Sequence, residues 1–329
     1  MFKQVLLLFF IVLGFAPSTL AQVQQMEANS FFAPADTFDQ KRFNYSLGVG
    51  LATYTGVSIG LWHTWYKQYP QEGFHFFNDL GEWNDVDKVG HVYSGYFQSL
   101  LCYEGAKWTG MSDRKAMWTG MICGGLFQTT IEVMDGFSTN WGFSIPDFAA
   151  NVGGIGAFAL QHKYWGEQRI QLKVSSHPVD YPAMEFYDEE GVFISSLQDR
   201  VDDLYGATFL ERYLKDYNAQ TIWASVNVVS FLGKDAKWPR WLNLALGYGA
   251  ENLYGGFENV WEVDNETISL GPEWERYHQF YLSFDLDFTK VKTKNHFLRG
   301  LLKIFNIFKM PAPALELNSR GEFTFHLFR

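Results

Sequence analysis

Residues 87–108 have the sequence DKVGHVYSGYFQSLLCYEGAKW, a mostly apolar stretch that begins with three ionisable side chains. His91 follows Asp87 by four residues and Lys88 by three, so a helix places all three on one side. The stretch is one of four that predict helices, the others being residues 46–66, 113–135 and 145–165. Residues 44–61 also admit a strand, because apolar and small side chains alternate from residue 46 onward.

Three apolar stretches are also candidate membrane spans, namely residues 44–66, 115–135 and 148–165. Small residues recur there at four-residue spacing, as in Gly56/Gly60 and Gly120/Gly124, which lets helices approach closely in lipid. Tryptophan and tyrosine gather at the ends of these stretches, as they do at membrane interfaces. We therefore predict a membrane-embedded or membrane-associated bundle; the alternative is a helical core in water with glycine at close crossings.

The composition indicates a folded, exported protein. Of 329 residues, 47% are hydrophobic and 19% are charged, which excludes a disordered chain. The net charge of −10 argues against broad nucleic-acid binding, which needs a basic face. Residues 1–21 resemble a signal peptide, with Lys3, an apolar run and Ala21 at a small-residue cleavage site. No cysteine follows that site, so we expect no lipid on an N-terminal cysteine.

The two cysteines, Cys102 and Cys123, lie in apolar stretches and are expected to be buried thiols. A bridge between them requires their two segments to pack side by side.

Changes in polarity, charge and hydrophobic periodicity divide the chain into four regions. A polar lead-in (residues 22–43) precedes the helical domain (44–165), an acidic connecting segment (166–218) and a strand-rich region (219–329). Apolar residues occupy the even positions of 280–288, which predicts a half-buried strand. Further strands are predicted at residues 170–176, 220–231, 241–250 and 322–328.

Three other segments complete the prediction. A helix is expected near residues 197–205, and residues 251–275 suit a long exposed loop. Residues 296–310 predict a basic amphipathic helix that lies either in a membrane interface or over the sheet. The fold class is therefore α+β: a four-helix bundle followed by a mainly antiparallel β region.

Polar side chains interrupt three of the predicted helices. The candidate site residues are Asp87, Lys88, His91, Glu132, Asp135, Asp147 and Asn151. If the helices pack together, these side chains converge on one pocket, and ionisable groups in an apolar bundle are costly unless paired. Plainer roles are open for some of them: Asp147 fits a capping box with Ser144, and Asp87 complements a helix dipole.

These residues resemble a known family. The run Asp87-Lys88-Val89-Gly90-His91, the pair Glu132 and Asp135, and residues 141–148 with Asn151 are similar to the uncharacterised YfiM-like "predicted periplasmic lipoprotein" family. They are similar, more distantly, to the VanZ-like membrane proteins. The resemblance covers residues 74–165, and the strand-rich remainder looks like that of long Bacteroidetes-type members. It implies an envelope location and no established reaction.

Two functions follow as expectations. The first is an envelope protein that binds an anionic lipid or lipid-linked component through Lys88 and His91, or uses them only to fix helix packing. The alternative is a hydrolase acting on a lipid or wall precursor, with His91 as general base and Glu132 and Asp135 orienting it.

His91, Glu132 and Asp135 are also the candidate ligands of a divalent metal such as zinc, manganese or magnesium. A small transporter has no supporting motif. Membrane lipid is the expected partner and nucleic acid is not, while protein partners, cofactors and the choice of inner or outer membrane stay open.

Overall fold

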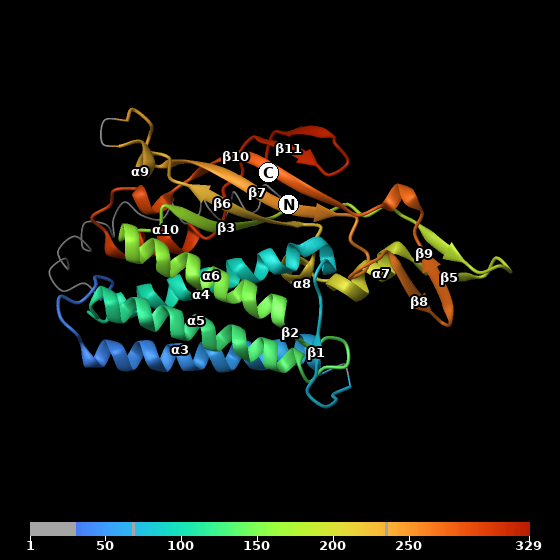
Figure 1. Ribbon diagram of the computed structural model, residues 1–329, viewed down its shortest axis with the longest axis horizontal. Helices are drawn as coiled ribbons and strands as arrows, with labels where there is room; N and C mark the ends of the chain where they lie inside the picture. Colours follow the sequence, from blue (N-terminus) through green and yellow to red (C-terminus); the bar gives the residue numbers. More distant parts are fainter. Residues whose placement is uncertain (1–30, 68–69, 234–235) are drawn as a thin grey trace, which may run out of the picture.

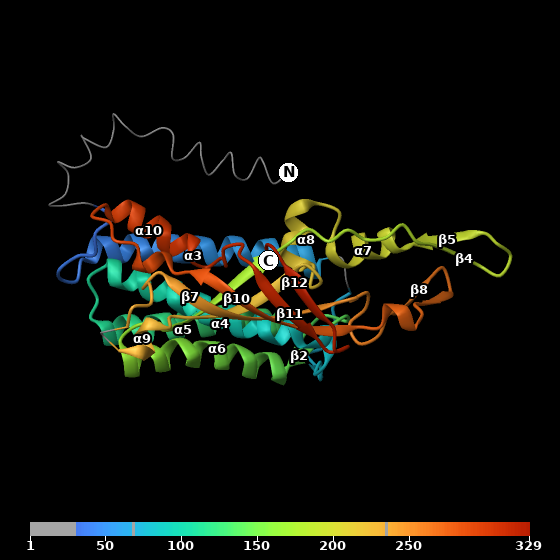
Figure 2. The ribbon, with the colours of Figure 1, turned by 90° about the horizontal axis from the view of Figure 1, so that it is seen from above.

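The computed structural model describes residues 31–67, 70–233 and 236–329. The predicted signal peptide lies outside these residues, as do residues 22–30 of the polar lead-in. The described chain forms a helical layer, a six-stranded sheet that lies over it, and an extension at one end (Figures 1 and 2). This is an α+β architecture, as the sequence predicts.

The helical layer contains the four predicted helices. They are α3 (Gln40–Leu61, continued by the π-helical turn Trp62–Tyr66), α4 (Val86–Trp108), α5 (Asp113–Asp135) and α6 (Ile145–Trp165). The strand alternative for residues 44–61 is wrong, because α3 covers them. The Ser144 hydroxyl accepts a hydrogen bond from the Asp147 amide, which is one of the two bonds of the predicted capping box. Asp87 lies in the first turn of α4, where a negative charge complements the helix dipole.

Glycines set how closely these helices pack. A Cβ atom on Gly154 of α6 would lie 2.0 Å from the Val92 carbonyl oxygen of α4, and one on Gly120 of α5 would lie 2.4 Å from that of Ser99. Both crossings therefore require glycine. A Cβ atom on Gly56 or Gly60 of α3 would meet nothing within 4 Å, so this predicted pair makes no close crossing.

The prediction that some of these helices span a membrane is not supported by the structure. Among the helices of the described residues, none is both long enough and apolar enough to cross a bilayer. Glycine, serine, threonine and ionisable residues such as Glu132 and Asp147 lower the hydropathy of these helices.

The cysteine prediction is half right. Helices α4 and α5 do pack side by side, and both thiols are free. Cys102 is half-buried, close to the expectation, whereas Cys123 is exposed even though the two thiols are within hydrogen-bond reach of each other.

The main sheet is antiparallel, with the strand order β12-β11-β10-β7-β6-β3. Its strands are β3 (Ile170–Ser176), β6 (Gln220–Val226), β7 (Leu242–Glu251), β10 (Tyr277–Leu286), β11 (Ala314–Asn318) and β12 (Phe323–His326). Five of them were predicted, with β6 ending earlier because a short helix, α9 (Val229–Leu232), follows. Strand β11 was not predicted. Helix α4 contacts β3, β6 and β7.

The burial of β10 is the reverse of that in an ordinary half-buried strand. Phe280, Leu282 and Phe284 are 51%, 42% and 48% exposed, whereas Tyr281 and Asp285 are 2% and 1% exposed. The strand prediction was correct, but the polar positions face the interior and the apolar positions face outward.

The extension has its own core, and the loop predicted for this region is a correction. Residues 251–275 are not a loop: they contain the hairpin of β8 (Val260–Val263) and β9 (Glu266–Ser269). The hairpin packs on α7 (Leu197–Tyr205), which was predicted, through a buried cluster of Leu197, Val201, Tyr205, Tyr254, Trp261 and Ile268. The acidic segment supplies β4 (Glu185–Tyr187), β5 (Phe193–Ser196) and α8 (Phe209–Lys215).

The basic amphipathic helix is α10 (His296–Phe305), shorter than predicted. It is joined to the sheet at its C-terminal end, where the buried Asn306 side chain contacts Lys173 of β3.

Candidate functional site

Lys88 lies at the centre of three carboxylates. Its Nζ atom is 2.8 Å from Asp79 Oδ2, 3.0 Å from Asp87 Oδ2 and 2.7 Å from Asp147 Oδ1. Burial favours the neutral amine, but the carboxylates outweigh it and raise the pKa of Lys88 above its ordinary value. The lysine is therefore charged and fully engaged with groups from α4, α6 and the loop before α4.

His91, one turn further along α4, joins all three central helices. Its Nε2 atom is 3.7 Å from both Asp87 Oδ1 and Asp147 Oδ1. Its Nδ1 atom is 3.1 Å from Asn151 Oδ1 and 3.4 Å from Glu132 Oε1. Asn151 in turn donates a hydrogen bond of 2.9 Å to Glu132. The imidazole is thus oriented by α5 and α6 on one side and faces two carboxylates on the other.

Close helix packing explains why these side chains meet. A Cβ atom on Gly95 of α4 would lie 2.5 Å from the carbonyl oxygen of Asn151, so the two backbones touch one turn beyond His91. The Ser144 cap fixes the start of α6, and its hydroxyl also donates to Asp79 at 2.6 Å. The side chains of α4 and α6 therefore have little freedom to separate.

A strained segment leads into α4. Trp83, Asn84 and Asp85 have φ angles of 52°, 50° and 57°, a left-handed conformation that side chains other than glycine rarely adopt. The surrounding structure holds this segment, because Trp83 donates its amide to Gly256 and Tyr248 donates its hydroxyl to the Asn84 carbonyl. Strain of this kind is often found next to functional sites.

Asp135 belongs to the same pocket but has a different partner. The Tyr66 hydroxyl donates a hydrogen bond of 2.6 Å to Asp135 Oδ1. Burial raises the pKa of Asp135 to about 6 even though this hydrogen bond opposes the shift.

All seven predicted side chains are therefore close together, and we call them, together with Asp79, the acidic cluster. Their functional roles remain predictions. Glu132 is fully buried, and its Oε2 atom has no hydrogen-bond partner among the described residues. Burial raises the pKa of Glu132 to about 8, with Asp147 and Asp135 adding to the effect.

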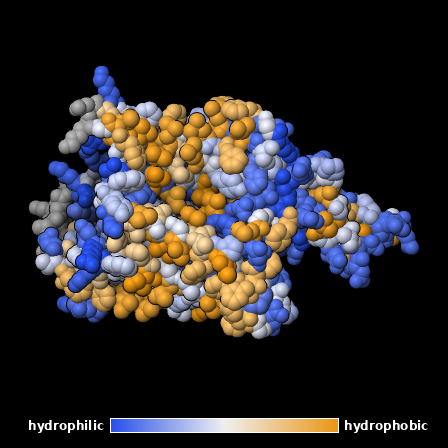
Figure 3. All heavy atoms as spheres, viewed as in Figure 1, coloured by the Kyte–Doolittle hydropathy of each residue, from blue (hydrophilic) through white to orange (hydrophobic). Residues whose placement is uncertain are grey.

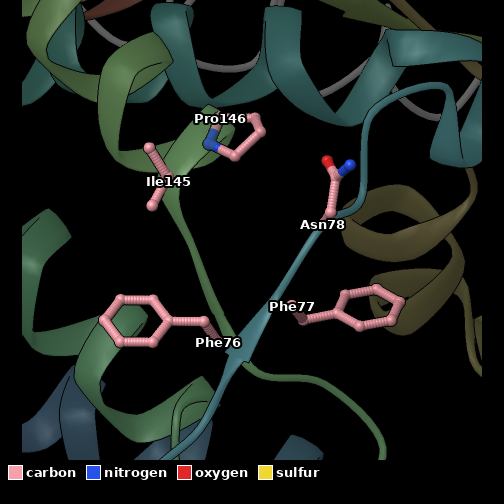
Figure 4. Close-up of a pocket in the computed structure, with 5 residues that line it drawn as sticks. All are labelled: Phe76, Phe77, Asn78, Ile145 and Pro146. Carbon is pink, nitrogen blue, oxygen red and sulfur yellow. The ribbon is translucent and has the colours of Figure 1, made fainter.

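Two neighbouring cavities, which share one lining residue, lie beside the acidic cluster. The first is polar, has a volume of about 190 Å³, and is lined by Asp79, Glu82, Asp87, His91, Asp135, Asp147 and Tyr217 among others. The second has a volume of about 350 Å³ and is lined by Phe76, Phe77, Asn78, Ile145 and Pro146 (Figure 4). Phe77 lines both cavities, and the second is mainly apolar.

One group of side chains in the acidic cluster could hold a metal ion, and it shares His91 with the predicted ligands. Asp87, His91 and Asp147 can each offer one ligand atom, and these atoms lie within 4.8 Å of one another. The predicted combination of His91 with Glu132 and Asp135 does not form such a group among the described residues. Glu132 instead contacts the other ring nitrogen of His91, and Asp135 is held by Tyr66.

Sequence reasoning missed several residues of this site. The Tyr217 hydroxyl donates a hydrogen bond of 2.7 Å to Asp87. The two residues are 130 positions apart in the sequence, so no local pattern predicts this contact. Asp79 and Glu82 precede α4 and have no helical spacing to mark them. Their position in a short acidic stretch directly before the DK-x-x-H segment is the one available signal.

Comparison with known proteins supports the envelope assignment. Residues 71–163 match a family described as "Predicted periplasmic lipoprotein", and all seven predicted site residues fall inside the match. The match fits an exported protein of the cell envelope. The comparisons do not confirm the VanZ-like or Bacteroidetes-type resemblance. No curated protein and no solved structure matches significantly.

Proposed function

We propose that this exported envelope protein binds an amphiphilic, phosphate-bearing component of the envelope, with a divalent cation held by Asp87, His91 and Asp147. The observation that carries the proposal is a buried excess of carboxylates beside an apolar cavity. An amphiphile offers one group for each cavity: a phosphate for the acidic side and a hydrocarbon chain for the apolar side.

The charge balance requires the cation. Lys88 already contacts three carboxylates, so its charge is not available to a phosphate. Against the effect of burial, hydrogen bonds and nearby positive charge lower the pKa values of Asp79 and Asp87. These two ionised carboxylates exceed the single charge of Lys88 and would repel an anion through a poorly screening interior. A divalent cation lowers this repulsion and gives the phosphate a ligand position. Carboxylate oxygens and an imidazole nitrogen suit manganese, zinc or magnesium.

The second cavity supports a hydrocarbon chain on the same ligand. Phe76, Phe77, Ile145 and Pro146 line it, and Phe77 separates it from the acidic cavity. Pockets for small molecules are commonly apolar with a few placed polar groups. Phospholipids and phosphorylated isoprenoids share this combination of phosphate and chain.

Metal binding is the first test. We expect isothermal titration of the metal-stripped full chain with Mn²⁺ or Zn²⁺ to show one ion per chain. His91→Ala or Asp147→Asn is expected to weaken binding by at least about 100-fold, the upper range for outer-shell losses. His162→Ala, near the opposite end of α6, is the matched control and should bind normally. A protein that binds no ion, and loses only stability on these changes, would show that the cluster has a purely structural role.

Ligand binding is the second test. Short-chain phosphatidic acid and farnesyl phosphate serve as probes of the two ligand sources, each with and without Mn²⁺. We expect binding to require the cation, and Phe77→Ser to weaken probe binding without changing the metal stoichiometry. Binding that is equally strong without the cation would contradict the charge argument.

Hydrolysis is a second candidate function, favoured by the orientation of His91. One ring nitrogen contacts Asn151 and Glu132, while the other faces the cavity, as in an oriented general base. Release of inorganic phosphate or of the alcohol from either probe would support it. His91→Gln should then abolish turnover while leaving the circular dichroism spectrum unchanged.

A further inference from the structure

The exposed face of strand β10 carries apolar side chains, whereas a strand face in contact with water usually carries polar ones. Along β10, the exposed positions are Phe280, Leu282 and Phe284, while a charged side chain, Asp285, is buried. The hydrophobic effect drives the opposite arrangement when water surrounds a strand. The reversal indicates that the medium on the outside is itself apolar.

The exposed apolar side chains continue across neighbouring strands. The register places Leu246 of β7, Leu282 of β10, Leu315 of β11 and Phe325 of β12 in one row, and all four are 40–62% exposed. Phe280, Leu317 and Phe323 form a second row beside it. Cross-strand neighbours of this kind make a continuous patch rather than scattered residues.

The helical layer exposes a second apolar surface. None of the residues of α3 is buried, and its exposed apolar side chains are Tyr45, Leu47, Val49, Leu51, Tyr54, Val57 and Ile59. Helix α6 adds Val152 and Leu160. Figure 3 shows hydrophobic residues over both the sheet and the helices, with hydrophilic residues gathered toward the two ends of the long axis. A single protein partner covers one patch and not several sides.

A cationic segment borders this surface. Residues 290–309 contain six lysines or arginines and no acid, in a chain with a net charge of −10. Lys292, Lys294 and Arg299 of this segment are exposed, next to the exposed Phe297 and Leu298 of α10. Basic residues flanking apolar ones are complementary to anionic lipid head groups.

We propose that the apolar surface formed by β7, β10–β12, α3 and α6 contacts the hydrocarbon of a lipid bilayer, with the α10 segment against its anionic head groups. This surface is separate from the acidic cluster, and the proposal does not depend on the metal or on the amphiphile. A second copy of the chain is the competing occupant, and the experiment below distinguishes the two.

The test is flotation of the purified full chain with vesicles of phosphatidylethanolamine and phosphatidylglycerol, after removal of detergent. We expect the protein to float with the vesicles. The triple variant Phe280→Ser, Leu282→Ser, Phe284→Ser should lower the vesicle partition coefficient by about 100-fold, because three half-exposed side chains lose their transfer from water to lipid.

A matched control comes from the extension. Tyr187, Val192 and Phe193 are 55%, 58% and 52% exposed but lie on the β4–β5 hairpin, away from the apolar surface. Their triple replacement by serine should leave flotation unchanged. Replacing Lys292, Lys294 and Arg299 by glutamine should remove the preference for phosphatidylglycerol over phosphatidylcholine, which keeps the proposal testable if the first variant fails to fold.

Two results would overturn the proposal. One is a wild-type chain that stays monodisperse in detergent-free buffer and does not float. The other is a wild-type dimer, measured by light scattering, that does not bind vesicles and that becomes monomeric in the triple serine variant of Phe280, Leu282 and Phe284. This outcome would assign the surface to a second copy of the chain.

Discussion

Two of the places where the protein buries charge, one in the sheet and one in the acidic cluster, differ in balance. In the sheet, Lys173 Nζ lies 2.7 Å from Asp285 Oδ2, and both side chains are fully buried. Lys173 also donates to the Leu286 carbonyl and Asn306, and Asp285 accepts from Ser225 and Met310. The acidic cluster instead sets one lysine against several carboxylates, one of which, Glu132, keeps an unpartnered oxygen.

The difference separates a structural role from a functional one. A buried pair whose hydrogen bonds are complete has no capacity left for a ligand. A cluster with excess negative charge beside a cavity has such capacity, and the protein bears the cost of that imbalance. The contrast supports the proposal that the sheet pair serves folding and the acidic cluster serves binding, and each prediction below tests it.

Removing the sheet lysine should have the largest effect. Lys173→Met leaves Asp285 buried without its counter-charge, and we expect a loss of about 3–5 kcal/mol in the free energy of unfolding. Urea denaturation measures it. The double variant Lys173→Met, Asp285→Leu removes both charges and should be less destabilised than the single one. Equal losses would mean that the pair is not the source of the stability.

Removing Lys88 from the acidic cluster should lower the free energy of unfolding by less, and a divalent metal should restore part of the lost stability. Lys88 is 11% exposed, so Lys88→Met leaves three carboxylates that water reaches in part, and we expect a loss of about 2–4 kcal/mol. A divalent cation replaces the missing charge, so Mn²⁺ should restore part of the melting temperature. Lys173→Met should show no such recovery, since Lys173 and Asp285 are fully buried away from water. Recovery in both variants, or in neither, would remove the contrast.

Helix packing at the acidic cluster gives the next effect. Gly154→Ala forces a methyl group against the Val92 carbonyl, where its Cβ would lie 2.0 Å away, and should destabilise by about 1–3 kcal/mol. Gly153→Ala is the matched control, because its Cβ would meet no atom within 4 Å. The control should gain up to about 1 kcal/mol from helix propensity. Thermal unfolding of the two variants compares them directly.

The helical half was predictable because its signals are local. Helix periodicity, the Ser144 cap and Pro146 fix the start of α6, and polar residues in apolar helices mark the site. These polar side chains come together because α4, α5 and α6 pack closely against one another at glycine residues. Tyr217 was not predictable, because its contact with Asp87 spans 130 residues.

The sheet half was predictable only in outline. Alternation in residues 280–288 identifies β10, but a period of two does not say which face is buried. The assumption that apolar residues point inward failed for Phe280, because the polar positions pair with one another inside. The extension core was missed because Tyr254, Trp261 and Ile268 have no common period and meet α7 only through tertiary packing.

The smallest predicted effect is a pH dependence specific to the acidic cluster. Burial raises the pKa of Asp135 from its ordinary value of 3.8 to about 6. The hydrogen bond from Tyr66 and the charge of His91 oppose this shift, whereas the nearby carboxylates of Asp87 and Asp79 add to it. The folded protein therefore binds a proton more tightly than the unfolded chain. The resulting stability is complete below pH 3.8 and is lost as the pH rises through about 6.

Asp135→Asn keeps an acceptor for Tyr66 but cannot ionise. Its free energy of unfolding relative to wild type should rise by about 1–2 kcal/mol between pH 4 and pH 7, measured by urea denaturation at each pH. Glu190→Gln, on an exposed turn of the extension, controls for the loss of one negative charge and should show no such rise. A difference between Asp135→Asn and wild type that stays constant across this range would mean that the Asp135 carboxylate is already balanced, and the cluster would then resemble the sheet pair.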